Sequence, residues 1–287
     1  MPSWARAGTD TIMQSLGLID DFGADHVAAA VVGRSGDIVG LRGDLEFHFP
    51  LASVTKLLTA MSIFVAVEEQ TLAFSDPAGP NGSTVRHLLS HASGLSQHDR
   101  KIALAVPGAK RIYSNVGFEV LGDYLAERSE IAFEEYLTTG VLAPLSMDST
   151  TCLGSAAAAG ASTIGDVAKF IKELLNPSLV SYSLMEEATS VAFPGLAGVV
   201  PGFGRQDPCD WGLGFEIKSS KYPHWTGEDN SERSYGHFGQ SGTFVLIDPA
   251  AGFGIGLLSD RRFGPWSAEA WPPFCDAVFR ELRHLSG

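Results

Sequence analysis

A hydroxyl and an amine stand three residues apart where a long apolar helix is predicted to begin, at Ser53 and Lys56. Side chains at this spacing lie about 60° apart around a helix axis, so the two can meet over the first turn. The apolar run LLTAMSIFVAV after Lys56 predicts a poorly solvated amine, and the positive helix N-terminus disfavours its charged form further. An amine held partly neutral can accept the Ser53 proton and make the hydroxyl a nucleophile.

The same pattern has an ordinary interpretation, in which the serine caps the helix and the lysine points to solvent. Two other short stretches bear on this choice. The tripeptide YSN at 113–115 leads into a predicted helix, and GHFGQSG at 236–242 leads into a predicted strand. Each stretch is a weak signal alone, because a Tyr-Ser-Asn tripeptide lies more often on a surface loop. Their order along the chain carries more information than either one.

The chain thus contains three motifs in a fixed order: Ser-x-x-Lys, Tyr-x-Asn and His-x-Gly. Together they resemble the three-part signature of the serine β-lactamase and penicillin-binding fold. The chain looks most similar to the class C β-lactamase-like serine hydrolases, a broad family of β-lactamases, DD-peptidases and esterases. The resemblance extends to FPLASVTKLLTA (49–60), VRHLLSHASGL (85–95), YSNVGFEVLGDYLAE (113–127), VLAPLSMDST (141–150), STIGDVAKF (162–170) and WGLGFEI (211–217).

The resemblance implies three catalytic residues. Ser53 would be the acylated nucleophile, and Lys56 would be the neighbouring proton acceptor and electrostatic anchor. Tyr113 would be the partner acid or base between the nucleophile and the leaving group. Whether Lys56 or Tyr113 is the base in acylation stays open, since the two can share a proton as a coupled pair.

The resemblance also implies a set of substrate-binding residues. Asn115 would form hydrogen bonds with Lys56 and with the substrate, and His237 and Gly239 would form the strand edge along which the substrate lies. The backbone N–H groups of Ser53 and Gln240 would form the oxyanion hole.

The third motif departs from the family pattern. It is His237-Phe238-Gly239, where class C β-lactamases have Lys-Thr-Gly; the phenylalanine has no hydroxyl, and the histidine is mostly neutral at pH 7. Asp260 follows the last predicted strand where those enzymes usually offer Asn, and it would repel a carboxylate unless Arg261 or Arg262 compensated. Weaker binding of anionic substrates is therefore expected along the strand edge that His237 and Gly239 would form.

These departures favour a hydrolase that acts through an acyl-enzyme on small carboxylic esters or amides. The first alternative is a β-lactamase or D-amino-acid peptidase, and the second is a non-catalytic binding protein that retains the fold. The implied partner is thus a small ester, amide or β-lactam substrate. The loop 218–235, with Tyr222, His224 and Trp225, is interpreted either as a wall of the acyl pocket or as ordinary surface.

Strand signals lie at both ends of the chain and helix signals in the middle. This order predicts an α/β fold of the α+β type: a mainly antiparallel sheet flanked by N- and C-terminal helices, with an inserted all-helical domain. The expected sheet domain comprises 1–52 plus 205–287, the helical domain comprises 53–204, and the active site lies in the cleft between them. The predicted helices cover 9–22, 54–70, 115–129, 163–175 and 268–285; the predicted strands cover 27–33, 37–42, 211–217, 242–248 and 252–259; and 194–210 is a predicted loop.

Composition excludes several other classes of function. The 287 residues carry a formal charge of −13, which argues against nucleic-acid binding. No apolar window is long enough for a membrane span, and the N-terminus lacks the apolar segment of a signal peptide, so a cytoplasmic protein is expected. The three cysteines are too far apart to suggest a disulfide framework and predict reduced thiols.

Neither a metal nor a cofactor is predicted. His87 and His91 stand four residues apart, as zinc ligands do, but no third ligand has a matching spacing, so a structural role is favoured. The chain contains neither Gly-x-Gly-x-x-Gly nor a P-loop, so no nucleotide cofactor is expected. The sequence makes no prediction of oligomeric state.

Overall fold

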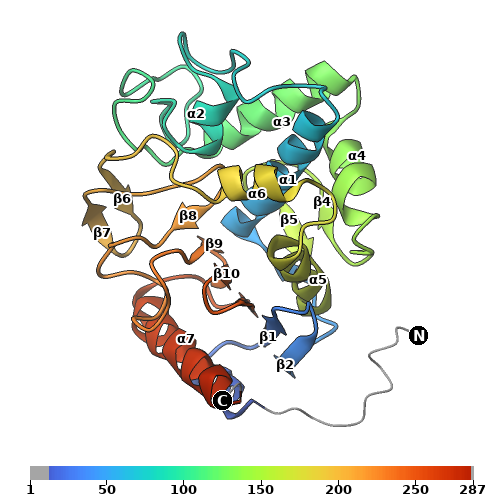
Figure 1. Ribbon diagram of the computed structural model, residues 1–287, viewed down its shortest axis with the longest axis vertical. Coiled ribbons are helices and arrows are strands. Elements are labelled where there is room, and N and C mark those ends of the chain that lie inside the picture. Colours follow the sequence, from blue (N-terminus) through green and yellow to red (C-terminus); the bar gives the residue numbers. More distant parts are fainter. Residues whose placement is uncertain (1–12, 286–287) are drawn as a thin grey trace.

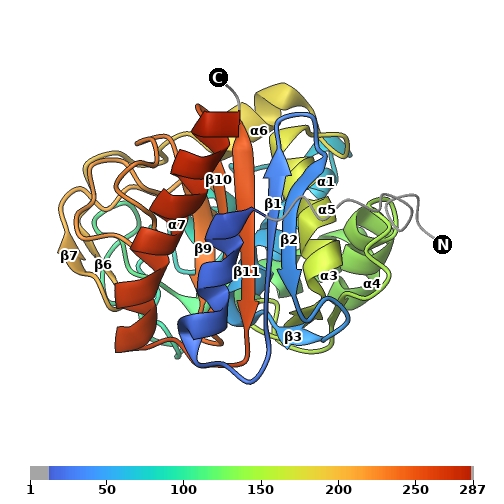
Figure 2. The ribbon, with the colours of Figure 1, turned by 90° about the horizontal axis from the view of Figure 1, so that it is seen from below.

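A six-stranded antiparallel sheet forms the centre of the computed structural model, which describes residues 13–285 (Figures 1 and 2). Its strand order is β2-β1-β11-β10-β9-β8. The strands are β1 (Val27–Gly33), β2 (Ile38–Gly43), β8 (Glu216–Ile217), β9 (Tyr235–Gly239), β10 (Thr243–Asp248) and β11 (Phe253–Ser259). Because β1 pairs with β11 over its whole length, from Val27 opposite Ser259 to Gly33 opposite Phe253, opposite ends of the sequence meet in the middle of the sheet.

Helices cover both faces of this sheet. On one face, the 3₁₀ helix η2 (Gln14–Phe22) lies beside α7 (Pro265–Leu285), as Figure 2 shows. The Glu281 carboxylate joins these two helices, since it accepts the backbone N–H groups of Gln14 and Ser15 at 2.8 Å each. On the other face, α5 (Ile164–Leu175) packs so closely on β11 that a Cβ on Gly256 would lie 2.9 Å from Val167 Cγ1.

The middle of the chain is mainly helical. A 3₁₀ turn, η3 (Ala52–Val54), leads into the buried helix α1 (Thr55–Glu68). The other helices are α2 (Val85–Leu89), α3 (Asn115–Ser129), α4 (Phe133–Leu137) with the π turn η4 (Thr138–Leu142), and α6 (Tyr182–Ala188). Two small sheets complete this part, one of β3 (Phe49–Pro50), β5 (Gly160–Ser162) and β4 (Thr151–Cys152), the other of β6 (Gly198–Val200) and β7 (Gly204–Gln206).

The predicted fold class is confirmed, with local differences. The predicted helix 9–22 is a 3₁₀ helix over Gln14–Phe22, and its residues 9–12 lie outside the described part of the chain. The predicted loop 194–210 contains the β6–β7 hairpin. The predicted strand 211–217 is mostly irregular, because Gly214 adopts a left-handed φ of 85° and only the last two residues join the sheet. Among the described residues, no helix is long and apolar enough to cross a bilayer. The three cysteines are buried and free, as expected for reduced thiols.

Candidate active site

Ser53 lies in the 3₁₀ turn η3 rather than at the N-cap of the long helix, where it was expected. The helix α1 begins two residues later, with Val54 at its N-cap. The preceding residue, Ala52, has a φ of 44°, a left-handed conformation that costs energy for any residue with a Cβ. This strained turn directs the chain so that Ser53 stands at the positive end of α1 with its side chain only half buried.

Lys56 lies on the first turn of α1 and is completely buried. Its Nζ lies 2.8 Å from Asn115 Oδ1, 2.9 Å from the carbonyl oxygen of Ala157 and 3.2 Å from Ser53 Oγ. Burial lowers the pKa of Lys56 from its ordinary value to about 7, as the apolar run in the sequence suggested. A substantial fraction of the amine is therefore neutral near pH 7.

These three contacts define which way the neutral amine points. A neutral amine has two N–H bonds and one lone pair. The amide oxygen of Asn115 and the carbonyl oxygen of Ala157 can only accept hydrogen bonds, so they take the two N–H bonds. The lone pair is left for Ser53, whose hydroxyl can both donate and accept.

Tyr113 is the third group at Ser53, and its hydroxyl donates to Ser53 Oγ at 2.8 Å. Burial raises the pKa of this phenol above its usual range, so it keeps its proton near neutral pH. The ring of His91 packs 4.5 Å from the Tyr113 ring, and His91 Nδ1 accepts the backbone N–H of Ser114. The structural role expected of His91 is thus to support the phenol, while His87 pairs with the Thr84 hydroxyl.

The strand β9 lies along the other side of Ser53. Because side chains alternate along a strand, His237 and Gly239 face η3, whereas Phe238 faces the opposite aromatic core with Trp225 and Phe244. This alternation explains how phenylalanine fits between the other two residues of the motif. A Cβ on Gly239 would lie 2.5 Å from the carbonyl oxygen of Leu51, so only glycine lets the strand approach this closely.

Replacing Gly239 with alanine is expected to push β9 away from η3, the turn that carries Ser53. Overpacking of this kind typically costs about 1–3 kcal/mol in the free energy of unfolding, and activity should fall with it. Urea denaturation of Gly239→Ala measures this loss. Gly165→Ala is the matched control, because its added methyl would meet only the Thr163 hydroxyl at 3.9 Å. An unfolding midpoint equal to that of the control would show that β9 accommodates the added methyl group without moving, which would contradict this prediction.

The hydrogen bonds of His237 define its tautomer. Its Nδ1 lies 2.7 Å from the backbone oxygen of Phe238, which can only accept, so Nδ1 carries the proton. Burial and the nearby Lys56 lower the pKa of His237 to about 3, and the ring is therefore neutral. The other nitrogen, Nε2, then bears a lone pair, and it has no hydrogen-bond partner among residues 13–285.

A small cavity of about 70 Å³ opens beside Ser53. The described residues that line it are Ser53, Gln97, Tyr113, Asn115, Val200, Pro201, Trp211, Glu216, His237, Phe238 and Gln240. Five of the seven site residues predicted from the sequence are in this lining. The other two lie behind it: Lys56 contacts Ser53 from inside the protein, and Gly239 lies against Leu51. Among residues 13–285, neither an arginine nor a lysine lines the cavity.

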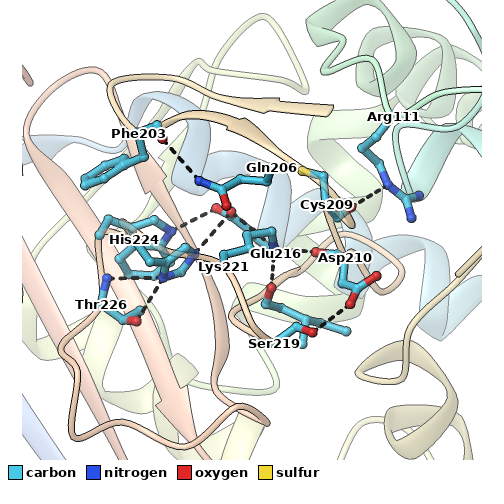
Figure 3. Close-up of polar contacts among 12 residues, drawn as sticks. Arg111, Phe203, Gln206, Cys209, Asp210, Glu216, Ser219, Lys221, His224 and Thr226 are labelled. Carbon is cyan, nitrogen blue, oxygen red and sulfur yellow. Dashed lines mark hydrogen bonds and ion pairs between the residues drawn. The ribbon is translucent and has the colours of Figure 1, made fainter. Parts of the chain in front are cut away.

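Glu216 is a buried carboxylate in this lining that the motifs do not reveal. Figure 3 shows it between His224, whose Nε2–H donates to Oε1 at 3.2 Å, and Lys221, whose Nζ lies 3.4 Å away. Trp225 Nε1–H donates to the other oxygen at 2.8 Å. Burial alone would raise the pKa of Glu216, but Lys221 and these donors hold it at about 2. The carboxylate is therefore ionised.

One expectation about a neighbouring segment was wrong, and for a second segment the structure bears on an interpretation that the sequence left open. Asp260 is not among the described residues that line the cavity; its carboxylate accepts the backbone N–H of Asp25, next to the paired ends of β1 and β11. The acidic group at the cavity is Glu216 instead. In the loop 218–235, His224 and Trp225 are buried behind Glu216 and Tyr222 is 76% exposed, so none of the three forms the wall directly.

Known proteins share this architecture. A family profile described as Beta-lactamase matches residues 18–274. A solved β-lactamase from Mycobacterium bovis is 49% identical, with a TM-score of 0.92, and the match covers 93% of this chain and 99% of that one. EstCE1, a hydrolase with promiscuous acyltransferase activity, shares the fold at 16% identity and a TM-score of 0.75, over 93% and 99% of the two chains.

The curated relatives match over a shorter range. N-acetylmuramyl-L-alanine amidase of Bacillus subtilis is 33% identical over 106 residues, which is 36% of this chain but 22% of the amidase. The family profile, in contrast, includes η3 with Ser53, Tyr113 and β9 within its limits. The chain therefore belongs to the Beta-lactamase family and is a serine hydrolase.

Proposed function

We propose that this serine hydrolase cleaves small, uncharged carboxylic esters through an acyl-enzyme at Ser53. The observation that carries the proposal is the lining of the cavity, in which a neutral histidine and the ionised Glu216 stand where an anionic substrate would need a cation. A volume of about 70 Å³ favours short substituents. Amides are the next candidates, because the same carbonyl chemistry applies to them.

In acylation, Ser53 Oγ attacks the ester carbonyl carbon while its proton passes to the neutral Lys56 amine 3.2 Å away. The carbonyl oxygen gains negative charge, which the backbone N–H groups of Ser53 and Gln240 stabilise. The bond to the leaving alcohol then breaks, and Tyr113 gives that alkoxide a proton. The phenolate is reprotonated by the Lys56 ammonium, whose Nζ lies 4.9 Å from the Tyr113 ring centre. Lys56 is thus neutral again when the alcohol departs.

Deacylation uses the same groups. A water molecule attacks the acyl carbon, Lys56 accepts its proton, and the bond between that carbon and Ser53 Oγ breaks. The Ser53 alkoxide takes back a proton from Tyr113, which already donates to it at 2.8 Å, and Lys56 restores the phenol. The products are the free acid and the starting enzyme.

The dependence of activity on pH tests the role of Lys56. Because the pKa of Lys56 is about 7 and the neutral amine is the reactive form, kcat/KM should fall about tenfold per unit as pH drops below 7. It should level off above that value, since burial keeps the Tyr113 phenol protonated. Initial rates on 4-nitrophenyl acetate between about pH 5 and pH 9 give the profile. A flat profile across that range would contradict a lysine base.

A β-lactamase is the second candidate, favoured by the 49% identity to the Mycobacterium bovis β-lactamase. The deciding experiment compares kcat/KM for 4-nitrophenyl acetate and for a chromogenic cephalosporin. We expect the ester to be the better substrate, because the cephalosporin carboxylate meets Glu216 and no cation in the lining. Intact mass after treatment with a fluorophosphonate should show one adduct, on Ser53. Faster turnover of the cephalosporin would replace the ester assignment with the lactamase one.

A further inference from the structure

The cavity beside Ser53 offers hydrogen-bond acceptors at two positions of its lining. One is His237, whose Nε2 bears a lone pair because Nδ1–H is committed to the backbone oxygen of Phe238. This nitrogen is buried and has no partner among the residues that the structure describes. A buried acceptor left without a donor is costly, so a donor brought by the substrate would be bound strongly.

The other acceptor is Glu216. Its three protein partners, His224, Lys221 and Trp225, all belong to the β8–β9 connection behind the cavity, as Figure 3 shows for the first two. A carboxylate has about four lone-pair sites, so these contacts leave capacity on the cavity side. Because the surrounding groups hold the carboxylate ionised, it cannot donate a hydrogen bond. It attracts donors and repels anions.

In the proposed mechanism the leaving group is protonated by Tyr113, and both acceptors lie near this residue: burial raises the pKa of Tyr113 and the charge of Glu216 raises it further, and His237 packs close to the ring. The His237 ring centre is 5.8 Å from that of Tyr113, the phenol that protonates the leaving alcohol in the proposed mechanism. Trp211 packs against both rings, at 6.1 Å from Tyr113 and 5.4 Å from His237. The cavity holds about 70 Å³, room for roughly two or three water-sized groups. A short polar substituent on the alcohol therefore fits best.

We propose that the site selects esters whose leaving alcohol carries a second hydroxyl group, as in a monoester of a small diol, and that it excludes esters whose alcohol carries a carboxylate. His237 and Glu216 are the specificity residues, since both accept hydrogen bonds and neither supplies positive charge. This inference rests on the proposed ester hydrolysis, and it adds the class of leaving group.

The test uses three acetates that differ at one end of the alcohol: 2-hydroxyethyl acetate, propyl acetate and acetoxyacetate. The first two match in size and differ only in a terminal hydroxyl or methyl group. Acid release in a pH-stat gives kcat/KM for each, divided by its rate constant for hydroxide-catalysed hydrolysis. We expect the hydroxyl ester to exceed the propyl ester about 10- to 100-fold, the range for a hydrogen bond to a charged group. Acetoxyacetate should be slower than both.

Two variants test whether His237 and Glu216 cause this preference for the leaving alcohol. His237→Phe keeps a ring of similar size but removes the acceptor, and Glu216→Gln removes the negative charge while keeping the shape. We expect the hydroxyl-to-propyl ratio to fall at least about fivefold in His237→Phe. In Glu216→Gln, turnover of acetoxyacetate should rise relative to propyl acetate. Val200→Ala is the matched control, since it alters the same cavity without a polar group and should keep the wild-type ratios.

Each ratio comes from a single enzyme preparation, so a general loss of activity in a variant cancels. A wild-type ratio within twofold of one, or ratios unchanged in both His237→Phe and Glu216→Gln, overturns the inference while ester hydrolysis stands. If wild-type enzyme hydrolyses none of the three acetates and a fluorophosphonate leaves Ser53 unmodified, the proposed function itself fails, and this inference fails with it.

Discussion

Replacing Ser53 with alanine is expected to lower kcat/KM for 4-nitrophenyl acetate by about 10⁴-fold or more, the scale seen when a nucleophile is removed. The hydroxyl accepts a hydrogen bond from Tyr113 at 2.8 Å and lies 3.2 Å from Lys56, so it is the atom on which both proton-transfer groups converge. Stability should change little, because the side chain is only half buried and lines the cavity. Initial rates and urea denaturation of the same preparation measure both quantities.

Ser35→Ala is the control for this substitution. Ser35 lies in the turn of the β1–β2 hairpin, where its hydroxyl donates to Asp37, far from the cavity lining. Its activity should equal that of the wild type. Ester turnover by Ser53→Ala within tenfold of this control would remove the basis for an acyl-enzyme at that residue.

Replacing Lys56 tests whether a neutral amine, rather than a positive charge, is required. Lys56→Met fills a similar volume without a proton acceptor, whereas Lys56→Arg retains the charge and cannot lose its proton near neutral pH. Both variants are expected to lose about 10³-fold or more in kcat/KM, because general-base catalysis contributes about 10²–10⁴-fold and the Asn115 contact is lost as well. Single-turnover acylation rates measure the effect directly.

The two substitutions distinguish the possible roles of the amine. If Lys56→Arg kept most of the acylation rate while Lys56→Met lost it, the side chain would act as a charge and Tyr113 would be the better candidate for the base. Circular dichroism should accompany both measurements, because an arginine buried at this position lacks room and its charge is poorly solvated. A folded Lys56→Met protein with a low acylation rate is the informative result.

The sequence predicts the reacting groups better than it predicts their surroundings. Ser53 and Lys56 are neighbours on one turn, and the cap that starts α3 is local too, since Ser114 accepts the N–H of Gly117. Such contacts follow from spacing along a helix. The hairpin, the long helices and the strands β10 and β11 could be predicted for the same reason, because the periodicity of a segment depends on its own residues.

Glu216 shows what the sequence leaves open. It lies in a stretch that reads as an ordinary strand, and its ionised state depends on Lys221, His224 and Trp225, which lie in an irregular loop without periodicity. Asp260 was the better candidate by its place after a strand, yet its carboxylate turns to the backbone of Asp25. Loop conformations are determined by tertiary packing, which a single sequence does not encode in any local pattern.

The pairing of β1 with β11 has a consequence for synthesis of the enzyme on the ribosome. The β1–β2 hairpin is made early, but its partner β11 is completed only when Ser259 has emerged. The strand β9, which carries His237 of the cavity lining, is made shortly before β11. A two-stranded hairpin without further partners is marginally stable, so the nascent chain must protect this apolar strand until then. We therefore expect the cavity to be completed, and activity to appear, only late in synthesis of the chain.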